Sequence, residues 1–147
     1  MQEDKIKEIE SKNQDAEKHF QKERDEWGEK IKNLVYMIRD VNELTEVSVL
    51  MLSYRHIIID TIANLQQTLY RQKSTYENFF KNKYVEYTTN YDVKLNGGEK
   101  EKFIRSDLAF LQRRLDLIEN QIDFFRECIR TLDNLGFSIR NRYRSIE

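Results

Sequence analysis

The stretch KFIRSDLAFLQRRLDLIENQIDFFRECIRTLDNL, Lys102–Leu135, decides the fold of this chain. Its large apolar residues alternate at intervals of four and three positions, and most residues between them are charged or carry side-chain amides. This is the heptad pattern of helices that supercoil against one another. The repeat consists of Ile104, Leu108, Leu111, Leu115, Ile118, Ile122, Phe125, Ile129 and Leu132. We expect one unbroken helix that stops at Gly136, because glycine adopts the left-handed C-terminal conformation without a side-chain penalty.

A second apolar line runs down the same helix beside the first and contains Phe110, Leu117 and Phe124. A helix with two apolar flanks needs neighbours on two sides. We infer that this helix packs both against its own chain and against another copy. The predicted oligomerisation contacts are Leu108, Leu111, Leu115, Ile118, Ile122, Phe125, Ile129 and Leu132.

The rest of the 147-residue chain also has helical patterning, so the predicted fold class is all-α. The absence of proline and the presence of only 4 glycines leave long helices uninterrupted outside Asn96–Gly98 and Gly136. Met1–Asp40 and Asn42–Tyr91 have apolar residues at helical intervals, and each is predicted to be one helix. A loop at Asn96–Gly98 would fold the second segment and the heptad helix into a long antiparallel hairpin. After Gly136, Ser138 is expected to cap a last short helix.

The N-terminal segment is the most acidic part of the chain and has the thinnest apolar seam. The first 46 residues carry 13 acidic and 9 basic side chains. Asn13 falls at a position of that seam, where a buried asparagine can fix the register of packed helices at some cost in stability. We expect Met1–Arg24 to fray in isolation unless a partner covers it.

Composition and motif spacing argue against an enzyme. The two histidines, His19 and His56, are far apart in sequence, and nothing nucleophilic accompanies His56 and Asp60, which lie one helical turn apart. The sequence contains neither a glycine-rich phosphate loop nor the spacing of metal ligands. We therefore expect no catalytic residue, no cofactor and no metal site.

Three features predict a cytoplasmic protein without a membrane segment. The single cysteine, Cys128, excludes an intrachain disulfide and suits a reducing compartment. No apolar run reaches the ~20 residues that a membrane-spanning helix requires. The N-terminal sequence MQEDKIKEIE lacks the apolar region of a secretory signal.

Cations and aromatic rings are interleaved in Tyr70–Lys94. Proteins that hold single-stranded nucleic acid place cations along the phosphates and stack rings on the bases. The candidate DNA-binding residues are Arg71, Lys73, Lys81, Lys83, Tyr84 and Tyr87, with Arg140, Arg142 and Arg144 in a basic tail. Alternatively, the rings form the core of the hairpin tip, the lysines only solvate it, and the tail is a flexible terminus. Because the net charge is −1, local clusters would have to carry any binding of a polyanion.

Three segments resemble the UvsY family of recombination mediators of T-even-like phages. They are VSVLMLSYRHIII from Val47, FFKNKYVEY from Phe79, and LDLIENQIDFFRECIRTLDNLGFSIRNRYRSIE from Leu115. The similarity covers Leu44–Glu147 and rests on the order and length of the elements, and Met1–Arg24 lies outside it. A lysine-x-arginine pair that is important for DNA contact in that family falls on Lys81 and Lys83. The second residue keeps the positive charge but lacks the planar guanidinium group.

The resemblance implies a cyclic homo-oligomer that is built through the C-terminal helix and binds single-stranded DNA. It also implies loading of a RecA-like recombinase onto strands covered by single-strand-binding protein, inside phage-infected bacteria. On this interpretation, residues 1–40 are a charged extension and residues 41–147 form a helical-hairpin domain for oligomerisation and DNA binding. The alternative is a coiled-coil scaffold that binds only proteins, which the heptads alone favour.

Overall fold

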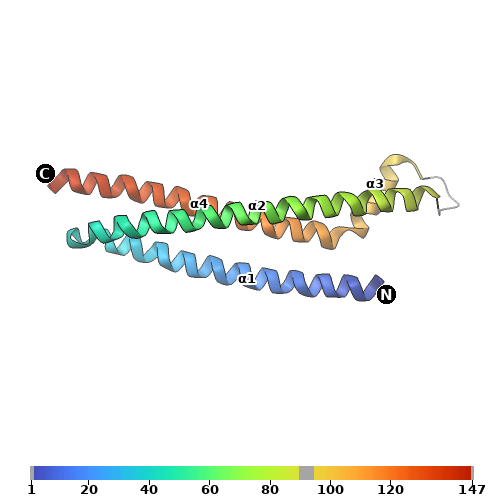
Figure 1. Ribbon diagram of the computed structural model, residues 1–147, viewed down its shortest axis with the longest axis horizontal. Coiled ribbons are helices and arrows are strands. Elements are labelled where there is room, and N and C mark those ends of the chain that lie inside the picture. The colour runs from blue at the N-terminus through green and yellow to red at the C-terminus, as the bar shows by residue number, and fades with distance from the viewer. Residues whose placement is uncertain (1, 90–94, 147) are drawn as a thin grey trace. The chain divides into compact units, whose positions relative to one another are not determined.

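Helices make up the computed structural model, which describes residues 2–89 and 95–146 (Figure 1). The elements are α1 (Gln2–Met37), η1 (Val41–Glu43, a 3-10 helix), α2 (Leu44–Thr89), α3 (Gly97–Asp107) and α4 (Ala109–Ile146). The predicted all-α class is confirmed. Within the described ranges, no helix is both long enough and apolar enough to cross a membrane.

Capping side chains determine where the short helices begin. Asp40 Oδ1 accepts a hydrogen bond from the backbone N–H of Asn42 at 3.0 Å and starts η1 between α1 and α2. Asn96 Oδ1 accepts one from the N–H of Glu99 at 2.8 Å and starts α3. Of the predicted loop at Asn96–Gly98, only Asn96 lies outside a helix, so the prediction is wrong for Gly97 and Gly98. The two glycines form the first turn of a helix, and no described glycine has a positive φ.

The heptad stretch forms two helices rather than one unbroken helix. α3 ends at Asp107, the backbone of Leu108 leaves the helical region at φ −100° and ψ 14°, and α4 begins at Ala109. Hydrogen bonds bridge the bend, since the N–H of Leu108 donates to Ile104 O at 2.9 Å and that of Gln112 donates to Leu108 O at 3.1 Å. Ile104 and Leu108 are both buried, so the apolar repeat continues across the break.

α4 continues past Gly136, so the predicted stop and separate last helix are wrong. The residues beyond it have a buried face of their own, where Ile139 is 4% exposed. Burying such a side chain contributes roughly 1.5–3 kcal/mol, which exceeds the ~1 kcal/mol that glycine costs inside a helix. Phe137 is consequently 58% exposed instead of packing back on the helix. The Ser138 hydroxyl donates to a carbonyl one turn earlier and caps no new helix.

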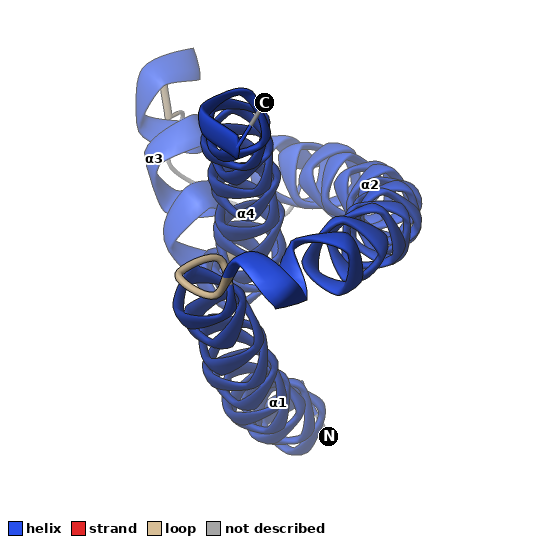
Figure 2. Ribbon diagram, turned by 90° about the vertical axis from the view of Figure 1, so that its left-hand side faces the viewer, coloured by secondary structure: helices blue, strands red, loops and turns tan. Residues whose placement is uncertain are grey.

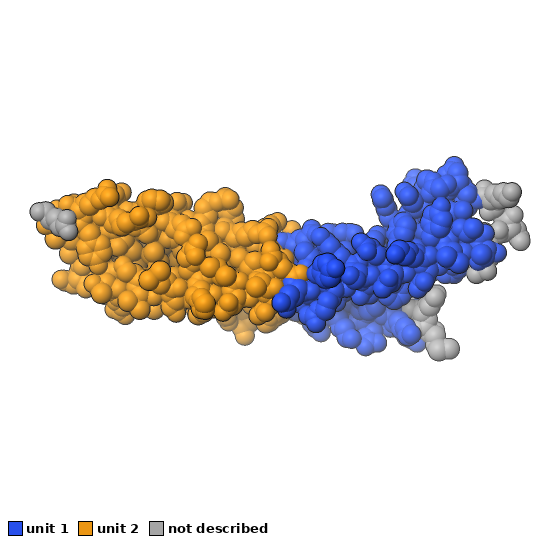
Figure 3. All heavy atoms as spheres, turned by 45° about the horizontal axis from the view of Figure 1, so that its top comes forward, with its two compact units in different colours: residues 1–17, 67–119 blue, residues 18–66, 120–147 orange. Residues whose placement is uncertain are grey.

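Two compact units divide the chain, and α1, α2 and α4 contribute to both of them (Figure 3). Unit 1 consists of residues 1–17 and 67–119 and includes α3. Unit 2 consists of residues 18–66 and 120–147.

The core of unit 2 lies between three helices, and Figure 2 shows α1, α2 and α4 running side by side. Trp27 of α1 joins the three, because its ring meets Tyr54 of α2 at 5.4 Å and Phe125 of α4 at 6.5 Å, both edge-on. A polar layer adjoins this core. Gln121, which is 0% exposed, accepts a hydrogen bond from Arg24 at 2.7 Å and donates one to Glu23 at 2.9 Å. The N-terminal helix is therefore an integral part of this unit.

The core of unit 1 lies where α2 meets α3 and the start of α4. Ile104, Leu108 and Leu111 are buried there against Tyr76 and Phe80 of α2. Polar contacts attach α1 to α4 in this unit. Asn13 is 1% exposed and its Nδ2 donates to Phe110 O at 2.9 Å, while Arg113 pairs with Glu17 at 2.6 Å. The seam asparagine is thus buried, and α4 contacts the N-terminal segment at Asn13 and Glu17.

The predicted oligomerisation residues lie in the interior of a single chain. Seven of the eight are at most 8% exposed, and the eighth, Ile129, is half-buried against the unit 2 core. The seven are Leu108, Leu111, Leu115, Ile118, Ile122, Phe125 and Leu132. Their role between copies stays a prediction.

Candidate nucleic-acid interface

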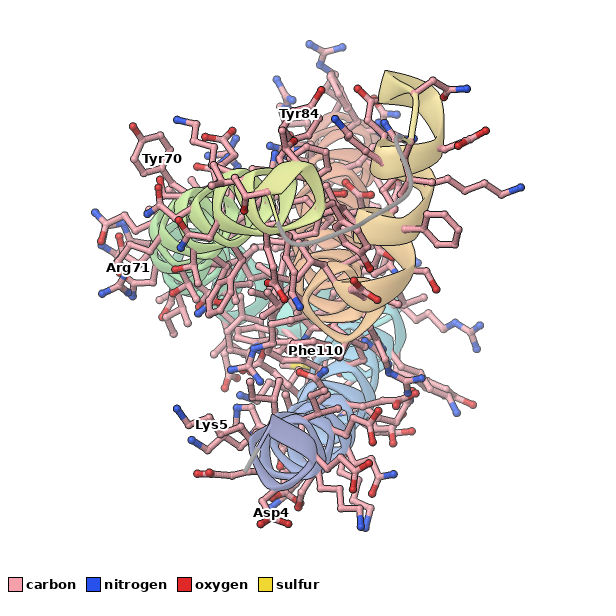
Figure 4. The ribbon with its side chains drawn as sticks, turned by 90° about the vertical axis from the view of Figure 1, so that its right-hand side faces the viewer. Asp4, Lys5, Tyr70, Arg71, Tyr84 and Phe110 are labelled. Carbon is pink, nitrogen blue, oxygen red and sulfur yellow. The ribbon has the colours of Figure 1, made fainter. Side chains whose placement is uncertain are left out.

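The part of α2 that belongs to unit 1 presents cations and aromatic rings on its outer side. Between Gln67 and Thr89 it carries four basic and two acidic residues. Tyr70 is 75% exposed, and Figure 4 shows Tyr70 and Arg71 pointing away from the other helices. On its inner side, Phe80 anchors this part of α2 to the core of unit 1. The outer side chains are therefore displayed on a fixed helix.

Two of the predicted cations have no ion-pair partner among the described residues. Lys81 is exposed, and no side chain in the described ranges forms an ion pair with it. Arg71 also has no ion-pair partner among the described residues, and its Nη2 makes only a 3.4 Å hydrogen bond to Thr68 Oγ1. A phosphate could bind either group without displacing a carboxylate.

The other two predicted cations of α2 are paired at the surface. Lys73 Nζ lies 3.5 Å from Glu119 Oε1, and Lys83 Nζ lies 3.6 Å from Glu86 Oε2. An exposed pair such as Lys73–Glu119 contributes only about 0–1 kcal/mol, so a polyanion could compete for Lys73 at a small cost that Arg71 and Lys81 do not incur. The Lys83 side chain is only 24% exposed and is less accessible to a polyanion.

The aromatic residues of the stretch divide between two roles. Tyr84 is 39% exposed, and Lys100 Nζ lies 5.2 Å from its ring centroid. Tyr87 is half-buried, stacks on Phe103 at 6.1 Å and donates its hydroxyl hydrogen to Asp107. Tyr84 is accessible for stacking on a base, whereas Tyr87 joins α2 to α3.

The predicted stretch extends beyond the end of α2. Two of its members, Tyr91 and Lys94, lie outside the described residues.

The basic tail is helical and belongs to unit 2. The Arg140 guanidinium lies 4.5 Å from the centroid of the Phe137 ring, and Arg142 Nη2 donates to the Arg39 carbonyl at 3.4 Å. Arg144 is exposed in the last turn of α4. The three predicted arginines therefore stand on an ordered helix, in the other unit from the basic stretch of α2.

A groove of about 310 Å³ within unit 1 contains basic residues that lie outside the predicted DNA-binding set. Lys12 and Asn13 of α1, Gln72 and Phe79 of α2, and Arg114 of α4 line it. Each of these residues taken singly has the pattern of a seam or solvated position, and only the packing of three helices brings them together. The one feature of the sequence that could have indicated this site is the pair of adjacent cations Arg113 and Arg114 within the heptad stretch.

Reactive groups are sparse in the described part of the chain. Burial raises the pKa of the Cys128 thiol to about 11, and the Glu127 carboxylate adds to the shift, so the nucleophilic thiolate is disfavoured. His56 Nε2 and Asp60 Oδ2 are 3.5 Å apart on an exposed face. No group of three or more side chains that could hold a metal ion occurs within residues 2–89 and 95–146.

Comparisons with known proteins leave the basic, aromatic face of α2 as the main observation on function. No protein-family model matches the sequence, and neither a curated protein nor a solved structure is significantly similar to it.

Proposed function

We propose that this protein binds single-stranded DNA as a homo-oligomer and acts as a recombination mediator. The observation that supports DNA binding best is the outer face of α2 in unit 1. Arg71 and Lys81 have no ion-pair partner there among the described residues, and Tyr70 and Tyr84 are exposed. Cations neutralise phosphates and exposed rings stack on bases, which allows a strand to be held regardless of its sequence. Such binding requires no covalent step.

The mediator role rests on the resemblance of Leu44–Glu147 to the UvsY family. Its proposed partners are single-stranded DNA, a RecA-like recombinase and single-strand-binding protein, in the cytoplasm of a phage-infected bacterium. A mediator must hold a strand and then release it to the recombinase. Solvent-exposed cations suit this exchange, because their contacts with phosphates are individually weak.

An apolar face of α2 supports the homo-oligomeric part of the proposal. Four large side chains within three turns of unit 2 are exposed, namely Val49 (63%), Leu52 (70%), Ile57 (46%) and Ile59 (40%). At about 100° per residue, Val49 and Leu52 lie next to each other on the outer side of the helix, and Ile57 and Ile59 flank the exposed His56–Asp60 pair. Exposed apolar groups of this kind commonly mark a protein interface. We assign this face to contact with a second copy. Repetition of a modest basic face in an oligomer would raise the avidity for a long strand.

A protein-binding scaffold is the second candidate function. The same apolar face favours it, since that face could receive a different protein instead of a second copy. A scaffold needs no affinity for nucleic acid, so DNA binding separates the two candidates.

Fluorescence anisotropy with a labelled oligo-dT across a salt series tests the proposal. Replacing both Arg71 and Lys81 by alanine removes two phosphate contacts, so the slope of log affinity against log salt should fall by about 1.4. The matched control replaces Arg126 and Arg130 by alanine. These exposed cations of α4 are already paired with carboxylates on their own helix. A wild-type protein that fails to bind oligo-dT at low salt would support the scaffold. An Arg71/Lys81 variant that binds like the control would exclude this face.

A further inference from the structure

The groove between α1, α2 and α4 in unit 1 has a positively charged lining. Two cations face it, Lys12 from α1 and Arg114 from α4, and no described residue of the lining is acidic. Its volume of about 310 Å³ is at the lower end of the range of small-molecule sites, roughly 300–1,000 Å³.

Positive charge in the groove is only partly neutralised. Arg114 forms no ion pair with a described residue, and its one hydrogen bond, from Nη1 to the Lys12 carbonyl, is 3.4 Å long. Lys12 pairs with Glu8 at 3.3 Å, but both side chains are about two-thirds exposed, at 67% and 66%. Water screens such a pair strongly. An anion that enters the groove would thus meet one unpaired guanidinium and one weakly held ammonium group.

The lining of the groove also contains an aromatic ring and a buried amide. Phe79 is 46% exposed although it lines the groove. Asn13 is 1% exposed, and while its Nδ2 donates to the Phe110 carbonyl, its Oδ1 accepts no hydrogen bond from the described chain. A buried acceptor without a partner costs about 1–3 kcal/mol.

Two further cations lie one turn from the groove but do not line it. Lys5 precedes the groove residue Ile9 by one turn of α1, and Arg71 precedes the groove residue Thr75 by one turn of α2. Figure 4 shows Lys5 and Arg71 extending from the same side.

We propose that this groove is a nucleotide subsite for single-stranded DNA, with Arg114 and Lys12 on the phosphate and Phe79 against the base. The amide of Gln72 supplies hydrogen-bond groups for the edge of the base. Cations together with a ring distinguish a nucleotide from a free inorganic anion, which has no use for the ring. This inference rests on the proposed DNA-binding function and adds to it a role for the N-terminal helix, which contributes Lys12.

Two single variants divide the site into its charged and stacking parts, each measured by oligo-dT anisotropy across a salt series. Arg114→Ala should weaken binding and lower the salt slope by about 0.7, the value for one phosphate contact. Phe79→Ala should weaken binding by about 5- to 150-fold and leave the slope unchanged. Arg126→Ala on the same helix is the control and should bind like wild type. Circular dichroism should show the same helix content for all three.

Photocrosslinking of the unaltered protein provides an independent readout. Oligonucleotides that contain bromodeoxyuridine should crosslink to peptides that carry Phe79 or Lys12, as located by mass spectrometry. Crosslinks confined to other peptides would overturn the groove, and so would strong wild-type binding that neither Arg114→Ala nor Phe79→Ala reduces. In both cases the wider DNA-binding proposal would stand. Absence of wild-type binding at low salt would overturn both proposals together.

Discussion

Replacing Gly136 by alanine distinguishes two conformations of the C-terminal region that differ in the sign of the expected effect. In the structure this glycine lies inside α4, and no described glycine has a positive φ. Alanine is favoured over glycine in a helix interior by about 1 kcal/mol. A Cβ built at Gly136 would lie 3.4 Å from Met51 Cε, at the short end of ordinary van der Waals contact with the end of a flexible side chain. We therefore expect the free energy of unfolding to rise by about 0.5–1 kcal/mol.

A left-handed Gly136 that ended the helix would give the opposite result, because alanine in that conformation costs roughly 1–2 kcal/mol. The two outcomes thus differ by about 2 kcal/mol, which is well within the resolution of guanidinium unfolding curves. In thermal unfolding, each 1 kcal/mol corresponds to about 2–4 °C for a chain of this size.

Gly28→Ala in α1 is the matched control. That glycine is also within a helix, and a Cβ there would have no neighbour within 4 Å. The control should therefore show the full gain of about 1 kcal/mol. A stabilised Gly28→Ala together with a destabilised Gly136→Ala would refute a continuous α4.

Three further predictions concern burial. Leu52→Asp should lower the mass of the protein measured by light scattering and leave its helix content unchanged. An unchanged mass for Leu52→Asp would exclude the contact between copies through α2. Leu115→Asp, at a site that is 5% exposed, should instead unfold unit 1. Arg24→Ala should destabilise the protein by about 1–3 kcal/mol in urea, because it leaves the oxygen of the buried Gln121 without its donor; a change below 0.5 kcal/mol would show that this layer is solvated. The thiol of Cys128 should react slowly with a disulfide reagent at pH 8 in the native state. The pKa of this thiol is about 11 in the native state and ~8.5 in the unfolded state, so the unfolded thiol loses its proton first. The free energy of unfolding should therefore fall as the pH rises from about 8.5 to 11. Fast labelling of the native protein would contradict the burial of Cys128.

Local patterns predicted the helices well, because a helix is a local structure. The expected helices Met1–Asp40 and Asn42–Tyr91 correspond to α1, Gln2–Met37, and α2, Leu44–Thr89. The heptad residues are buried as their spacing predicts, with Ile118 at 1% and Phe125 at 0% exposure. Both results follow from the spacing of apolar residues and from helix capping, which depend on residues close together in the sequence.

Local patterns failed where a distant segment changes the balance. Glycine by itself favours a helix end at Gly136, but burial of Ile139 beside other helices keeps α4 intact. A regular heptad favours one helix through Leu108, but the structure bends there and keeps Ile104 and Leu111 in one cluster with α2. In both places a long-range contact outweighed a preference of about 1 kcal/mol.

The candidate site divides in the same way. Interleaved cations and rings in the sequence were enough to select Arg71, Lys81 and Tyr84, because residues close together on one helix stay together in space. The groove could not be predicted from the sequence, because Lys12, Phe79 and Arg114 come from three different helices.

The sequence by itself determined that the chain is helical and which side of each helix is apolar, because those properties depend on residues only a few positions apart. The tertiary structure decided what covers each apolar side. The α4 seam could have faced a second copy, yet it is buried within one chain, and the exposed apolar face lies on α2 instead. A heptad repeat predicts that an apolar stripe is buried against another helix, but it does not predict which helix. That choice depends on contacts between residues far apart in the chain, such as Glu17 with Arg113.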